Sequence, residues 1–135
     1  MSLSGSLRRE VVARARLRCE YCGLAQIGQE AAFHVDQVIP VATGGPTVSA
    51  NLALACVSCS LRKGAKQTAV DPKTNKSAPL FNPRLHVWTE HLAWKGCRVI
   101  GLTATGRATV AGLRLNRTLI VAIRGEEALL GRHPP

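Results

Sequence analysis

The chain has 135 residues, which fits one domain and leaves little room for a two-domain enzyme with a hinge cleft. Hydrophobic residues make up 46% of it and charged residues 19%, a composition that excludes a wholly disordered chain. Eighteen lysines and arginines against eight acidic residues give a formal charge of +10. This charge favours a polyanionic partner, nucleic acid before an anionic membrane. Plain solubility is the alternative explanation.

The sequence predicts a soluble cytoplasmic protein that does not contact a membrane. Its first ten residues have no apolar region of the kind found in signal peptides. The uncharged run 37–61 has transmembrane length, but Pro40, Gly44 and Gly45 interrupt it, so it is expected to form buried strands joined by a loop. In the cytoplasm thiols stay reduced, and paired cysteines more often bind a metal than each other.

The predicted elements begin with a helix that Ser6 caps and whose apolar positions are Leu7, Val11 and Ala15. Two short strands flank a Gly-Gly turn, and a second helix ends at Gly64. These four elements are expected at residues 6–18, 33–41 (ended by Pro40), 52–55 and 56–63.

The second half starts with a predicted polar linker over 68–84, which contains three prolines. A hairpin follows over 91–94 and 97–102, with Trp94, Val99 and Ile100 facing a core. Two helices come last, one from Thr105-Gly106 and one capped by Asn116 or Thr118.

Two cysteine pairs are the strongest chemical signal in the chain. Cys19-x-x-Cys22 and Cys56-x-x-Cys59 are separated by 33 residues, and each spacing lets both sulfurs reach one ion from a single turn. Four thiolates form a closed tetrahedral site, which predicts a structural Zn²⁺ ion. Two disulfides or a thioredoxin-like redox pair are the alternatives. Cys97 is expected to be a small core residue, with a reactive thiol as the alternative.

The residues between the cysteine pairs add a second pattern. It runs through Phe33-His34-Val35-Asp36-Gln37-Val38-Ile39-Pro40, Gly44-Gly45, Asn51-Leu52-Ala53-Leu54-Ala55 and Cys59-Ser60-Leu61-Arg62-Lys63-Gly64. Here the sequence resembles the HNH endonuclease family, of the His-Me finger or ββα-metal group. Segments Asp71-Pro72, Leu80-Phe81-Asn82-Pro83-Arg84, Trp88-x-Glu90-His91, Gly101-Leu102-Thr103 and Gly106-Arg107-Ala108-Thr109-Val110 resemble the tail of small stand-alone bacterial HNH proteins.

The resemblance implies an α+β fold in a single domain, 1–135. Residues 6–66 are expected to form a ββα-metal core with an N-terminal helix. A structural zinc site of four cysteines is expected to stabilise this core. A linker at 67–90 and a C-terminal hairpin with helices at 91–131 complete it.

The resemblance also implies metal-assisted phosphodiester hydrolysis. A hairpin and a helix clamp one divalent cation, Mg²⁺ or Mn²⁺, on the scissile phosphate, while a histidine deprotonates the attacking water. No small-molecule cofactor is expected.

The catalytic candidates follow from matching this chain to the family pattern, residue by residue. Asp36 matches the metal-binding acidic residue and Asn51 the central asparagine. Gln37 stands where the family has its basic histidine, and an amide cannot accept a proton near neutral pH. Ser60 stands where the family has Asn or His. His34 lies two residues before Asp36 and on the same strand face, so it is a candidate metal ligand or replacement base.

Each candidate also has a structural interpretation. Asp36 would pair with Arg62 or Lys63, Asn51 would cap a loop, and His34 would bond to backbone within the strand. His91 is expected to be a structural partner of Glu90 or of the linker.

Two basic segments are expected to contact phosphates, one after the second cysteine pair and one on the first helix. Their residues are Arg62, Lys63, Lys66, Arg8, Arg9, Arg14 and Arg16. The first hypothesis is an HNH endonuclease that cleaves double-stranded DNA. Its activity is expected to be weakened, because Gln37 replaces the family's base and a positioned base contributes about 10²–10⁴ in rate. The second is a catalytically inactive nucleic-acid-binding protein of HNH fold. The third is a structural zinc-ribbon interaction protein.

Overall fold

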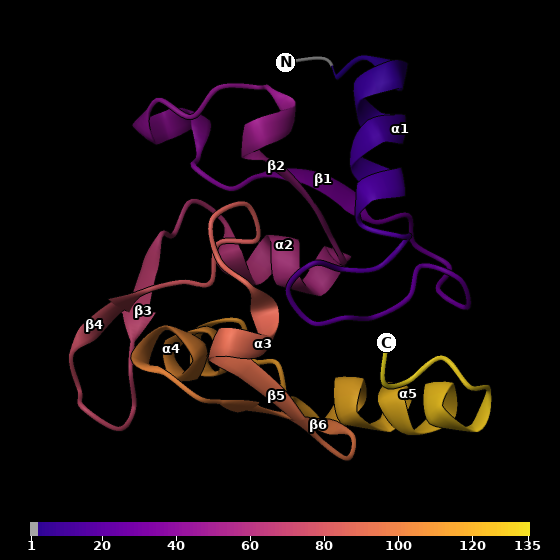
Figure 1. The fold of residues 1–135 in the computed structure, drawn as a ribbon, viewed down its shortest axis with the longest axis vertical. Helices are drawn as coiled ribbons and strands as arrows, with labels where there is room; N and C mark the ends of the chain where they lie inside the picture. Colours follow the sequence, from indigo (N-terminus) through magenta and orange to yellow (C-terminus); the bar gives the residue numbers. More distant parts are fainter. Residues whose placement is uncertain (1–2) are drawn as a thin grey trace.

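The computed structural model describes residues 3–135 and has a mixed α+β architecture, as predicted. Helix α1 (Gly5–Arg14) lies beside a two-stranded hairpin, with α2 packed below it (Figure 1). The remaining elements form a second layer around α4, and α5 lies at its edge. In chain order after α1 they are β1 (His34–Gln37), β2 (Leu52–Ala55), α2 (Val57–Lys63), β3 (Thr68–Val70), β4 (Ser77–Pro79), α3 (Trp88–His91), β5 (Leu92–Lys95), β6 (Arg98–Gly101), α4 (Ala104–Gly112) and α5 (Thr118–Leu129).

Helix α1 is shorter than predicted and begins earlier. Its cap is Ser4 rather than Ser6, because the Ser4 Oγ accepts a hydrogen bond from the Leu7 N–H at 3.2 Å. The helix ends at Arg14, before the predicted end at residue 18. Arg16 and Leu17 take left-handed backbone conformations, each with φ of 55°, and these turn the chain toward the first cysteine pair. Val11, on the inner face of this helix, is fully buried, as its spacing predicted.

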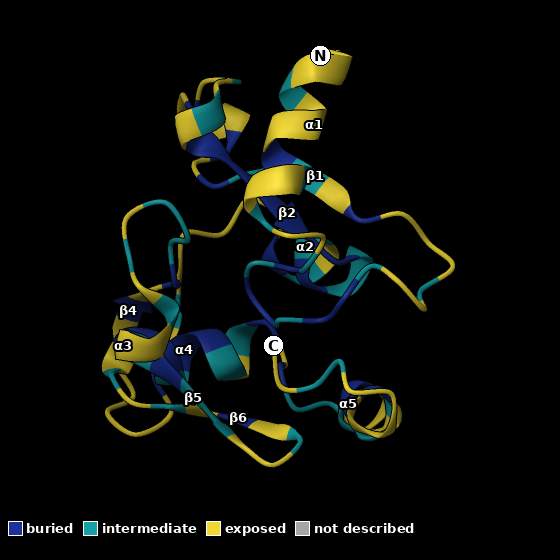
Figure 2. Ribbon diagram, turned by 45° about the vertical axis from the view of Figure 1, so that its right-hand side comes forward, coloured by how far each residue is buried: buried dark blue, intermediate teal, exposed yellow. Residues whose placement is uncertain are grey.

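Strands β1 and β2 pair antiparallel and give the hairpin of the ββα core. The register places His34 opposite Ala55 and Gln37 opposite Leu52. Strand β2 and α2 form where the sequence predicts them, and β2 is buried along its whole length (Figure 2). Strand β1 is shorter than the predicted 33–41, since its regular pairing stops at Gln37.

The prediction of a linker over 68–84 was wrong. Strands β3 and β4 pair antiparallel there and pack against α4. Asp71, fully buried at the end of β3, accepts hydrogen bonds from Arg107 Nε and Nη2, both at 2.9 Å. The polar composition of this segment suggested a linker. The hairpin forms because its buried carboxylate pairs with an arginine from α4, which is distant in the sequence.

The C-terminal hairpin β5–β6 forms as predicted, with Trp94 opposite the buried Val99. Its turn is Gly96-Cys97, one residue later than the predicted Lys95-Gly96, because Lys95 still pairs with Arg98. Ile100 was expected in the core, but it lies on the other face of the strand and is 40% exposed. The predicted caps of the last helix were also wrong. The side chain of Asn116 instead bonds the backbone N–H and carbonyl of Val99 at 2.8 and 2.7 Å, and Arg117 occupies the cap position.

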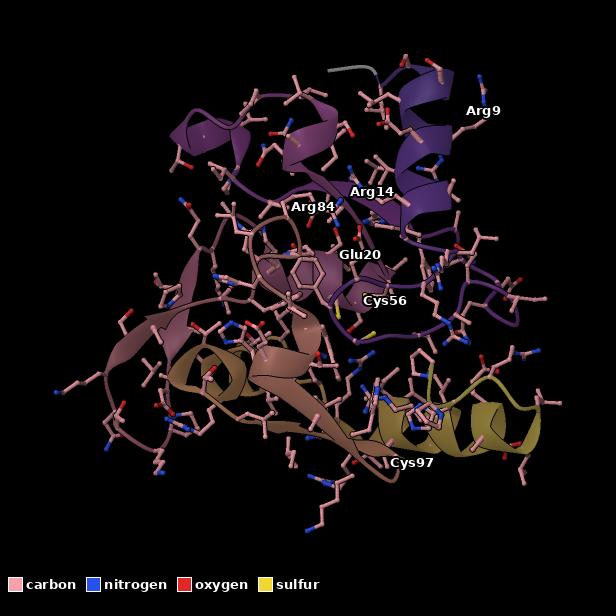
Figure 3. The ribbon with its side chains drawn as sticks, in the orientation of Figure 1. Arg9, Arg14, Glu20, Cys56, Arg84 and Cys97 are labelled. Carbon is pink, nitrogen blue, oxygen red and sulfur yellow. The ribbon has the colours of Figure 1, made fainter. Side chains whose placement is uncertain are left out.

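One continuous core joins the two layers. The Trp88 indole donates to the Tyr21 carbonyl at 2.9 Å, and Tyr21 packs edge-on against Phe81. Glu20 forms an ion pair with Arg84 (Figure 3). Within residues 3–135, no helix is long and apolar enough to cross a membrane.

Candidate metal centre and catalytic site

The two cysteine pairs come together as one buried group, which we call the four-cysteine cluster: Cys19, Cys22, Cys56 and Cys59. Their sulfur atoms all lie within 4.8 Å of one another, and no disulfide joins them. The turn before β1 supplies the first pair, and the N-terminal turn of α2 supplies the second. Because a disulfide needs sulfurs about 2 Å apart, four mutually close thiols fit one tetrahedral ion better than two disulfides.

Backbone geometry at each pair also suits metal-bound thiolates. The Cys22 N–H points to the Cys19 sulfur at 3.5 Å, and the Cys59 N–H points to the Cys56 sulfur at 3.4 Å. Burial raises the pKa of Cys19, and neighbouring sulfurs together with burial raise the pKa of Cys59. The pKa of Cys56 is lowered because the other three thiols donate to it. Four buried thiolates this close together would repel one another, so they require a cation between them.

The second site lies where β1 meets α2. The His34 Nδ1 atom is 2.9 Å from the Ser60 Oγ atom, so the strand histidine and the helix serine are direct partners. Asp36 follows two residues later, on the same strand face as His34. The structure thus brings together three of the predicted site residues.

Asp36 is a half-buried carboxylate with spare ligand capacity. Its Oδ2 atom is buried and has no hydrogen-bond partner among residues 3–135. Burial raises the pKa of Asp36, while the nearby charges of Lys63 and His34 lower it. A buried carboxylate oxygen without a partner is unfavourable unless a cation or a donor binds there.

Lys63 lies beside this carboxylate and not on the surface. Its side chain is 2% exposed, and its ammonium donates to the Gln37 carbonyl at 3.1 Å. Burial lowers the pKa of Lys63, and the charge of Asp36 opposes that shift. The sequence suggested Lys63 as a surface contact to phosphate, but the structure places it under the site, joining α2 to β1.

Gln37, at the position of the family's base, is turned away from His34 along the strand. Its amide Nε2 donates to the Thr47 hydroxyl at 2.6 Å. Its Oε1 atom is buried and has no partner among the described residues. This side chain anchors the loop between β1 and β2.

Asn51 also holds that loop. Its Oδ1 accepts from the Ile39 N–H at 2.8 Å, and its Nδ2 donates to the carbonyls of Ile39 and Pro46 at 3.0 and 2.9 Å. Gly45 packs close behind, where a Cβ atom would lie 1.7 Å from the Ile39 oxygen. Asn51 therefore has the loop-bonding geometry that its structural interpretation requires.

The basic residues fall into two groups. Arg62 and Lys66 line a cleft of about 570 Å³ with Arg114, which follows α4 and was missed in the sequence because it lies far from the motif. On α1, Arg8 donates to the Phe33 carbonyl at 3.0 Å, and Arg14 donates to the Leu52 carbonyl at 2.7 Å. These two arginines fasten the helix to the hairpin. The other two predicted contacts on this segment, Arg9 and Arg16, are exposed.

Neither His91 nor the fifth cysteine belongs to either site. The His91 Nδ1 atom is 2.7 Å from the Thr103 hydroxyl. Its ring packs against Phe81 and His86, with ring centres 6.4 and 4.8 Å away, so its structural partners include the predicted linker, as one of the two expectations had it. Cys97 is half-buried at the β5–β6 turn (Figure 3) and is less enclosed than a core residue.

Comparison with known families agrees with this geometry. Residues 19–66 match the family described as HNH endonuclease, a span that holds the four-cysteine cluster and the β1–β2–α2 unit. This part of the chain is an HNH domain. Searches of curated proteins and of solved structures gave no match.

Proposed function

We propose that the protein is an endonuclease that hydrolyses DNA phosphodiester bonds with a divalent cation. The HNH domain and the net charge of +10 support nucleic acid as the substrate class. The observation that carries the proposal is the cluster of His34, Ser60 and the unpartnered Asp36 oxygen at the junction of β1 and α2. Double-stranded DNA is the proposed substrate, and the cytoplasm, where thiols stay reduced, is the proposed location.

Two metals fit the donor sets. The four-cysteine cluster suits structural Zn²⁺, since thiolates prefer it and four ligands close the site. Asp36 offers a hard oxygen, which suits Mg²⁺ or Mn²⁺. When bound, that cation would supply Lewis-acid stabilisation of the scissile phosphate and the leaving oxygen.

His34 is the proposed general base in place of Gln37. A base needs an unprotonated nitrogen that can reach water, and imidazole is the side chain suited to this near neutral pH. For Nε2 to accept a proton, Nδ1 must carry the hydrogen and donate it to the Ser60 Oγ, 2.9 Å away. Ser60 therefore serves as a positioning residue that selects the active tautomer.

Lys63 supports Asp36 in this scheme. Its buried ammonium places a positive charge near the carboxylate, which favours the ionised form that binds a cation. The proposed surface contacts to DNA phosphates are Arg62, Lys66 and Arg114, together with Arg9 on α1 and Arg16 just after it.

The second candidate function is DNA binding without cleavage. Gln37 favours it, because its amide cannot act as a base and is committed to the Thr47 hydroxyl. In this case the HNH scaffold and its basic surfaces would be retained while the chemistry is lost.

Nicking of supercoiled plasmid in Mg²⁺, Mn²⁺ or EDTA tests the proposal. EDTA and Asp36→Ala should abolish nicking, and His34→Ala should slow it by about 10²–10⁴. His91→Ala is the matched control, since His91 contacts the Thr103 hydroxyl in the second layer and should leave the rate unchanged.

A Mn²⁺ titration separates the two roles considered for His34. Loss of a base lowers the maximal rate at saturating metal, whereas loss of a ligand raises the metal concentration needed. Salt-dependent DNA binding without nicking in any metal would contradict the nuclease and support the binding protein. Negligible DNA affinity at moderate salt would contradict both.

A further inference from the structure

Arg124 is a buried cation outside the HNH match. It lies on α5, is 2% exposed, and donates from Nη1 to the Cys97 carbonyl at 3.0 Å. The same nitrogen is 3.4 Å from the Asn116 side-chain oxygen, and the guanidinium carbon is 5.2 Å from the centre of the Trp94 ring. These contacts hold the side chain in place but offer no full negative charge.

No carboxylate among residues 3–135 is paired with this guanidinium. The Nε and Nη2 atoms of Arg124 are buried and have no hydrogen-bond partner among those residues. Glu127, one turn further along α5, is already bonded to Arg132. A buried charge without a counter-charge is costly, so the position calls for an anion nearby.

One member of the four-cysteine cluster, Cys22, lies next to Arg124. Arg124 and Cys22 line the same small cavity, whose volume of about 10 Å³ leaves room for at most one water molecule. Solvent therefore does little to screen the two groups from each other. Burial lowers the pKa of Arg124, and the charges of Cys22 and Cys59 oppose that shift.

Other charged groups around Arg124 do not take this role. Arg18, Glu127, Arg132 and His133 line the same cavity. Glu127 is paired with Arg132, Arg18 donates to the Gly23 carbonyl, and His133 contacts the Gly96 carbonyl. Arg117 adds a like charge that disfavours the guanidinium.

We propose that Arg124 neutralises part of the negative charge of the zinc-bound four-cysteine cluster, so that zinc holds the C-terminal helix against the HNH domain. One Zn²⁺ and four thiolates carry a net charge of −2, and the Arg124 guanidinium supplies +1 inside the same dry region. The inference rests on the zinc site proposed above.

The experiment measures zinc affinity by chelator competition for the wild type, Arg124→Met and Arg124→Lys. The methionine variant keeps the apolar stem and removes the charge, and the lysine variant keeps the charge. Arg117→Met is the matched control, because it removes the same charge from the start of α5 without lining the cavity. Arg124→Met should bind zinc about 10–100-fold more weakly, the usual effect of losing an outer contact to a metal site. Arg124→Lys and Arg117→Met should stay within about threefold of the wild type.

The possible failures are distinguishable. A wild type that binds no zinc contradicts the zinc site itself, and with it this inference. Equal zinc affinity of Arg124→Met and Arg117→Met overturns the role of Arg124 alone. If Arg124→Met does not fold, Arg124→Lys provides the test, because lysine keeps the positive charge. A folded lysine variant that loses more than tenfold in zinc affinity overturns the charge-neutralising role of Arg124.

Discussion

Replacing Asn51 by alanine tests whether the central asparagine of the site acts through structure. Its side chain makes three hydrogen bonds, one from the Ile39 N–H and two to the Ile39 and Pro46 carbonyls. The residue is 6% exposed, so water cannot fully replace these partners after the change. We therefore expect a loss of stability rather than a purely catalytic defect.

The magnitude follows from the number of bonds. Each hydrogen bond contributes about 1 kcal/mol net, and a buried group left unpaired costs about 1–3 kcal/mol. The Ile39 N–H loses its side-chain acceptor and the two carbonyls lose a donor, and all three bonds are partly buried. Asn51→Ala should therefore lower the free energy of unfolding by about 2–4 kcal/mol.

Urea denaturation followed by circular dichroism, with zinc at constant excess, measures this loss. Val48→Ala is the control from the same loop, because Val48 is 47% exposed and its truncation should change stability by less than about 0.5 kcal/mol. A loss below about 1 kcal/mol for Asn51→Ala, together with abolished nicking, would refute the structural role and make Asn51 a direct participant.

Three further predictions concern charge and metal. The Arg107 guanidinium holds the pKa of Asp71 well below its usual range, so the pair stabilises the fold above about pH 4 and loses this contribution as the pH falls. Asp71→Asn should therefore destabilise at pH 7 and flatten the acid limb of thermal melts, and an unchanged acid limb would contradict this. Zinc chelation should expose the thiols of the four-cysteine cluster to alkylation and loosen the fold, whereas thiols that react at the same rate with and without chelator would argue against a metal. Replacing Arg62, Lys66 or Arg114 by glutamine should each reduce the log–log salt slope of DNA binding by about 1, and an unchanged slope would remove that residue from the DNA surface.

Local signals in the sequence predicted the centre of the HNH domain well. Strand β2 is a short apolar run, and α2 is bounded by Cys56 and Gly64, so neighbouring residues decide both elements. The four cysteines were recognised by spacing alone, and the structure gathers them.

Long-range contacts explain what the sequence did not predict. The β3–β4 hairpin depends on Asp71 meeting Arg107, and Asn116 is drawn from its expected capping role to the backbone of Val99. In the site, neither the burial of Lys63 nor the contact of His34 with Ser60 can be derived from spacing. Each depends on how α2 packs against β1.

We propose that this domain cleaves DNA although glutamine stands at the family's base position. Plasmid nicking by the wild type beside Gln37→His, both in saturating Mn²⁺, tests it most directly. We expect the wild type to nick without the added histidine, and His34→Ala to slow this activity by about 10²–10⁴ in the wild-type background. Nicking by Gln37→His alone would contradict the account, because the metal site and DNA surface would then be intact in a protein that lacks a base.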